Sequence, residues 1–107
     1  MSAKLSKKKI YLVRKYMQNK SLLDILQQMT KTLCKIKTPP KSITKCKKML
    51  RTKHIHIYDF VQGNYKMCGS LHKLRQRILE IGPYPLEKVP GRLKPLLRNF
   101  QQVATRL

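Results

Sequence analysis

Residues 21–53 read SLLDILQQMTKTLCKIKTPPKSITKCKKMLRTK, and they contain both the strongest helical pattern of the chain and nine of its 25 Lys and Arg residues. Ser21 with Asp24 three residues later has the form of a capping box, so we expect a helix to begin there. Pro39–Pro40 cannot continue it, because proline has no amide hydrogen. The apolar residues between these limits recur at spacings of four and three, typical of a helix packed along its length: Leu22, Leu26, Met29, Leu33 and Ile36.

Other segments carry the same apolar period and have typical helix boundaries. Ser42 and Ser70 stand where a serine hydroxyl can cap a first turn, and Gly82–Pro83 stops a helix. Pro95 suits the first turn of a last helix. The expected helices cover residues 5–18, 21–36, 42–50, 70–81 and 95–107, with a stiff, proline-containing connector over residues 83–91.

Residues 54–68 interrupt the helical period. Ile55 and Ile57 alternate with polar and aromatic residues, which is typical of a strand. Gly63–Asn64 can supply a turn, with a short return strand behind it. The sequence therefore allows a β-hairpin near residues 54–68, which would have to pack on the helices to be stable.

Together these patterns predict a mainly α fold with four to five short amphipathic helices. A chain of 107 residues can build one modest core, but not a core and a separate catalytic domain. We therefore expect a single small domain over residues 1–107, with a strongly basic half (1–53) and a more globular helical half (54–107).

The charge of the chain is far from balanced. It contains 25 Lys and Arg residues against 4 Asp and Glu, a net charge of +21. Residues 1–53 hold 16 basic and one acidic side chain, and residues 54–107 hold nine and three. Such an excess indicates a polyanionic partner, which can be a nucleic acid, an anionic membrane surface or an acidic protein.

The longest stretch of the chain without Asp or Glu lies between Ile25 and Tyr58, and it holds nine basic residues. Apolar residues at helical spacing interleave them, which is not typical of a disordered tail. Nine like charges within 23 residues repel one another unless a polyanion compensates them. We call these nine residues the basic run and expect them to bind nucleic-acid phosphates: Lys31, Lys35, Lys37, Lys41, Lys45, Lys47, Lys48, Arg51 and Lys53.

A smaller basic cluster follows in the second half, formed by Lys73, Arg75 and Arg77. It could grip a phosphate, or it could be the solvated face of a core helix. Three aromatic residues near basic positions could stack on unpaired bases, although the phenylalanine also suits the core: Tyr58, Phe60 and Tyr65.

Catalysis finds little support, because the four carboxylates are scattered and no catalytic motif occurs. We expect no enzyme and no cofactor. Four residues could in principle hold zinc, with Cys46 in reserve: His54, His56, Cys68 and His72. Structural zinc sites are marked most clearly by a Cys-x-x-Cys pair, whereas here only Cys68 with His72 and His54 with His56 are near each other. Phosphate contact for the histidines and core packing for the cysteine are the alternatives.

Three cysteines without a close pair argue against a secreted disulfide framework and favour a reducing, intracellular compartment, such as the nucleus or nucleolus. No apolar run approaches the length of a membrane-spanning helix, and the first residues lack the apolar core of a secretory signal. The first 20 residues also fit a mitochondrial targeting segment, although the Lys7–Lys9 block is untypical of one.

We therefore expect a small basic nucleic-acid-binding protein that serves as a structural or assembly component of a ribonucleoprotein, for example a ribosome-like particle. RNA is preferred to DNA because neither a recognition helix nor a dimer seam is evident. Protein neighbours within such an assembly are expected as well. The alternative is a small regulatory or viral accessory protein whose amphipathic helices bind a host protein, with the basic run as a nuclear address.

Overall fold

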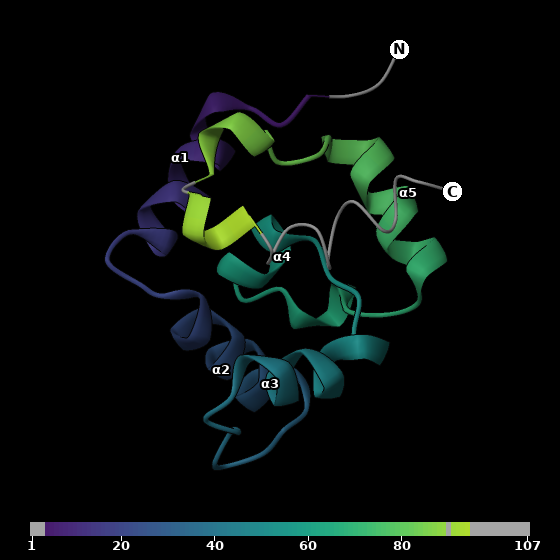
Figure 1. The fold of residues 1–107 in the computed structure, drawn as a ribbon. Helices are drawn as coiled ribbons and strands as arrows, with labels where there is room; N and C mark the ends of the chain where they lie inside the picture. Colours follow the sequence, from purple (N-terminus) through teal and green to yellow (C-terminus); the bar gives the residue numbers. More distant parts are fainter. Residues whose placement is uncertain (1–3, 90, 95–107) are drawn as a thin grey trace.

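The computed structural model describes residues 4–89 and 91–94, which form short helices joined by tight turns (Figure 1). The mainly helical fold of a small domain is confirmed. The expected last helix, residues 95–107, lies outside the described residues. The elements are α1 (Lys7–Met17), α2 (Leu22–Leu33), α3 (Ile43–Met49), α4 (Ile57–Val61) and α5 (Leu71–Ile81), with 3-10 turns η1 (Leu50–Thr52), η2 (Tyr65–Met67), η3 (Leu86–Lys88) and η4 (Gly91–Leu93).

The predicted starts of α2, α3 and α5 are confirmed at their capping serines. The Ser21 hydroxyl accepts a hydrogen bond from the amide of Asp24, and the Asp24 carboxylate accepts one from the amide of Ser21, which completes the capping box. Ser42 and Ser70 each cap a first turn in the same way, through the amide three residues later. These side chains satisfy helix amides that would otherwise lack partners.

Helix α2 ends earlier than the apolar seam predicted. Lys35 has a φ of 55°, in the left-handed region, and the amide of Ile36 donates to the carbonyl of Lys31 at 3.2 Å. This is the geometry of a Schellman motif, a common helix ending. The helix is therefore closed at Leu33 by its own backbone before Pro39 is reached.

The predicted hairpin near residues 54–68 was wrong. Residues 54–68 form no strand; a single β-bridge joins His54 to Gly69, whose amide donates to the His54 carbonyl at 2.9 Å. The segment instead forms α4, because the Nδ1 atom of His56 accepts a hydrogen bond from the amide of Tyr58 and caps the helix. Alternation of side chains over so few residues did not distinguish a capped helical turn from a strand.

Two helix pairs build the core: α1 packs against α4, and α2 packs against α3. The segment expected to be an extended connector also joins it, since Tyr84 and Val89 are buried there. Helix α5 holds a separate small apolar cluster of Leu74 and Ile78. The main cluster consists of Leu5, Val13, Met17, Ile25, Leu26, Met29, Leu33, Cys46, Leu50, Ile55, Ile57, Phe60, Tyr84, Val89 and Leu93.

Candidate nucleic-acid interface

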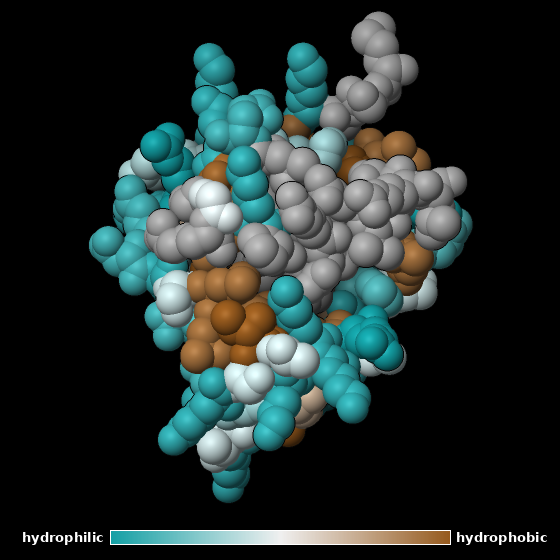
Figure 2. All heavy atoms as spheres, in the orientation of Figure 1, coloured by the Kyte–Doolittle hydropathy of each residue, from teal (hydrophilic) through white to brown (hydrophobic). Residues whose placement is uncertain are grey.

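The structure brings the basic run to one end of the molecule. Its residues occupy the last turn of α2, the loop over residues 34–42, helix α3 and the segment through η1 up to residue 53. Figure 2 shows hydrophilic side chains around the tip of this end, below a hydrophobic patch, where α2 and α3 lie in Figure 1. Lys47 and Lys53 are half-buried, and the other seven are exposed: Lys31, Lys35, Lys37, Lys41, Lys45, Lys48 and Arg51.

Core packing of α3 directs these charges outward. Cys46 is buried in α3 and Leu50 follows it in η1, so the intervening lysines occupy the remaining faces. The carbonyl of Pro40 fixes the preceding loop, because it accepts hydrogen bonds from the Gln27 amide at 2.9 Å and from the Cys46 thiol at 3.3 Å. The loop is thereby attached to both helices that flank it.

The charges of the basic run are not neutralised within the described part of the chain. Asp59 and Glu80 each form an ion pair with Arg77, which is not a member of the basic run. Asp24 is engaged in the capping box of α2. The basic run is thus a surface of like charge, without carboxylate partners among the residues that the structure describes.

The smaller basic cluster on α5 differs from the basic run, because its side chains have partners within the protein. Arg77 donates from Nε and Nη2 to the two carboxylate oxygens of the buried Asp59, at 2.9 and 3.0 Å, and from Nη1 to Glu80 at 3.0 Å. The hydrogen bonds to Asp59 raise the pKa of Arg77 above its ordinary value, against the opposing effect of burial, and the hydrogen bond to Glu80 adds to the rise. Lys73 donates to the carbonyl of Lys66 at 3.1 Å. Arg77 therefore attaches α5 to α4, and Figure 1 shows α5 apart from α2 and α3.

The residues considered for zinc do not converge. Both ring nitrogens of His56 are engaged, Nδ1 with the amide of Tyr58 and Nε2 with the carbonyl of Gly82 at 2.9 Å. Since Nδ1 accepts, Nε2 carries the hydrogen and the ring is neutral. Burial lowers the pKa of His56, against the opposing effect of the Gly82 hydrogen bond. Over residues 4–89 and 91–94, no group of three or more His, Cys, Asp or Glu side chains is placed to hold a metal.

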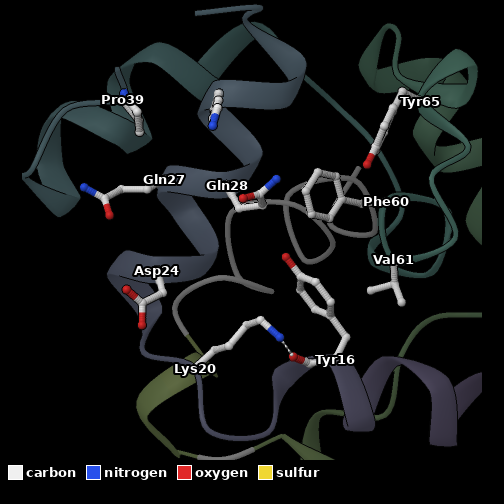
Figure 3. A pocket seen from close by; sticks show the side chains of 10 residues that line it. Tyr16, Lys20, Asp24, Gln27, Gln28, Pro39, Phe60, Val61 and Tyr65 are labelled. Atoms are coloured by element: carbon white, nitrogen blue, oxygen red, sulfur yellow. Dashed lines mark hydrogen bonds between the residues drawn. The ribbon is translucent and has the colours of Figure 1, made fainter. Parts of the chain in front are cut away.

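A pocket of about 650 Å³ lies beside the basic run. Phe60 and Tyr65, both considered for base stacking, line it together with Tyr16 of α1 (Figure 3). Tyr58 lies elsewhere, with the Lys9 amino group 5.2 Å from its ring centre. No sequence pattern indicated Tyr16, because the pocket forms only when α1, α2 and α4 pack together.

Within the described residues, no helix has the length and apolar character needed to cross a membrane. Comparison with protein-family models, with curated proteins and with solved structures finds no match to this chain.

Proposed function

We propose that this protein binds RNA through the basic run and serves as a structural or assembly component of a ribonucleoprotein. One observation carries the proposal: seven exposed basic side chains share one end of the molecule, and none of them has a carboxylate partner among the described residues. Repulsion among such charges is relieved when phosphates replace small counterions.

The shape of this surface favours RNA over DNA. Helix α3 has seven residues and is flanked by an irregular loop and a 3-10 turn. A reader of the DNA major groove usually presents a longer helix whose side chains reach base edges. Lysines distributed over a loop and short helical turns instead suit the uneven backbone of a folded RNA.

The three cysteines support a reducing compartment, because Cys34, Cys46 and Cys68 are all free thiols. We place the protein in the nucleus or nucleolus, with the mitochondrion as the alternative. Both compartments contain ribonucleoprotein assemblies in which further protein contacts would accompany the RNA.

The salt dependence of binding tests the proposal. If about six phosphates of a duplex are contacted, log K should fall against log salt with a slope of roughly −5. Fluorescence anisotropy with labelled RNA, measured between low and physiological salt, gives this slope. A complex with a protein that persists unchanged in salt, while RNA fails to bind, would favour the regulatory alternative, for which the partly exposed Ile43 and Met49 on α3 offer contacts.

A charge-matched pair of variants locates the surface. Replacing Lys45, Lys47 and Lys48 by Gln should weaken binding to unrelated RNAs about equally and should leave the helical circular dichroism signal intact. The control replaces three exposed lysines at the other end of the chain, Lys4, Lys7 and Lys8, which removes the same charge. Equal losses in the two triple variants would show that net charge, rather than the basic run, determines the affinity.

A further inference from the structure

The pocket beside the basic run has walls of two kinds. Aromatic rings from α1, α4 and η2 form one wall, and polar side chains from α2 form the other (Figure 3). Its volume of about 650 Å³ falls within the range of small-ligand sites, which is roughly 300–1,000 Å³. The lining residues are Tyr16, Lys20, Asp24, Gln27, Gln28, Lys31, Pro39, Phe60, Val61 and Tyr65.

The aromatic wall is built around Phe60, which is buried and fixed by the core. The ring of Tyr16 meets it edge to face, with centroids 6.1 Å apart, and the ring of Tyr65 lies 5.6 Å from it at an angle of 48°. The Lys20 amino group covers Tyr16, 4.2 Å from its ring centre. Tyr65 is 44% exposed, so its ring is the member of this wall that a ligand can reach most readily.

The polar wall runs along one face of α2. Asp24, Gln28 and Lys31 follow at spacings of four and three, so a single helix face presents all three to the pocket. The Gln28 amide makes one long hydrogen bond, to the Thr32 hydroxyl at 3.3 Å. An amide at such a position can both donate and accept hydrogen bonds along the edge of a planar heterocycle.

Two further observations indicate a ligand at this wall. The Tyr16 hydroxyl is buried and lacks a hydrogen-bond partner among the described residues, and Figure 3 shows it directed toward the space between Gln28 and Phe60. Burial, together with the nearby Tyr65, raises the pKa of Tyr16. The Tyr16 hydroxyl therefore remains neutral at physiological pH. Neutral donors and aromatic faces suit a base, whereas the lysines at the rim suit its phosphate.

We propose that this pocket receives one unpaired nucleobase of the RNA strand, stacked on Tyr65 with its edge toward Gln28. The inference rests on the proposed function, since the basic run is what brings the strand to the pocket. Lys31 belongs to both surfaces, so a strand whose phosphates follow the basic run reaches the aromatic wall without a break in positive charge. The protein then prefers segments with unpaired bases to continuous duplex.

Single-stranded RNA oligonucleotides of one length, with and without bases at the central positions, test the inference. The wild-type chain should bind the intact strand about ten-fold more tightly than the abasic one, as expected for one stacked base. Tyr65→Leu keeps an apolar side chain and should remove most of this preference, while the affinity for the abasic strand stays the same. Tyr11→Leu is the matched control, because Tyr11 is an exposed tyrosine outside the pocket and its loss should leave the preference intact.

Further measurements distinguish failure of this inference from failure of the proposed function. A Tyr65→Leu chain that keeps the ten-fold preference overturns the base pocket, whereas the lysine variants and the salt slope would still support RNA binding. Failure of every RNA to bind overturns both. On the unaltered chain, an RNA carrying 4-thiouridine should crosslink to the peptide that contains Tyr65, and a crosslink confined to peptides outside the pocket would contradict the inference.

A second pair of variants, one in the pocket and one outside it, tests the polar wall. Gln28→Met should reduce discrimination among the four bases at the crosslinked position, because methionine keeps the helix but offers no amide. Gln76→Met replaces an exposed glutamine within α5 that also bonds a residue four positions away, His72. This control should discriminate among the four bases as the wild type does. Equal discrimination by the two variants would show that Gln28 does not contact the edge of the base.

Discussion

Arg77 and Asp59 form a bidentate ion pair that joins α5 to α4 across 18 positions of sequence. The Asp59 carboxylate is 1% exposed, so its charge depends on this partner. Helix α5 otherwise packs mainly through a small apolar cluster of its own. The pair is therefore a polar contact that fixes α5 to α4.

We expect Arg77→Leu to lower the free energy of unfolding by about 3 kcal/mol, because it leaves a buried carboxylate without a partner. Glu80→Gln removes the exposed partner of the same guanidinium and should cost about 0.5 kcal/mol or less. Urea denaturation followed by circular dichroism measures both. Under conditions where the variant stays folded, Arg77→Leu should also leave the salt slope of RNA binding unchanged. A reduced slope would show that Arg77 contacts an RNA phosphate.

The second prediction concerns the loss of folding stability at mildly acidic pH. The pKa of His56 lies below its ordinary value because the ring is buried, so at mildly acidic pH the unfolded chain binds a proton that the folded chain does not. Stability should fall as pH drops below about 6.5, by at most roughly 1.4 kcal/mol per pH unit, until the lowered pKa of the folded state is reached. Denaturation curves at pH 7.5, 6.5 and 5.5 measure this.

The variant His56→Asn supplies the control for this slope, since asparagine can still cap α4 but does not titrate. It should flatten the pH dependence, leaving the smaller part due to His54, whose pKa burial also lowers. An unchanged slope in His56→Asn would contradict the prediction.

The third prediction separates folding from binding at one residue. Lys35 holds a left-handed conformation that glycine adopts without steric cost, so Lys35→Gly should raise the free energy of unfolding by roughly 1 kcal/mol. The same change removes a basic side chain and should weaken RNA binding several-fold. Lys35→Gln removes the charge but keeps a side chain at the left-handed backbone position. It should therefore weaken RNA binding to a similar degree without the gain in stability.

The helices were predictable wherever a local signal decided them. Ser21, Ser42 and Ser70 mark true helix starts, and Gly82 with a φ of 91° ends α5 as expected. These signals act over three or four residues and require no knowledge of the remaining chain. The end of α2 was missed because a lysine, Lys35, takes the left-handed position usually filled by glycine.

Features that depend on distant partners were not predictable from spacing. His56 appeared to be part of an alternating strand, yet it caps α4 and bonds Gly82, 26 positions away. The partner of Arg77 and the pocket around Tyr16 likewise arise only when separate helices pack. The basic run differs from these features, because its members are neighbours in the sequence and share an acid-free segment, and its role in binding stays a prediction.

The two hydrogen bonds on the Pro40 carbonyl have a consequence for recognition. One comes from Gln27 on α2 and the other from Cys46 on α3, so the backbone between them is already ordered in the unbound protein. A preorganised loop loses little conformational entropy when a ligand docks. The backbone positions of the lysines in this loop are therefore fixed before binding. The protein can then select a ligand by the spacing of its anionic groups.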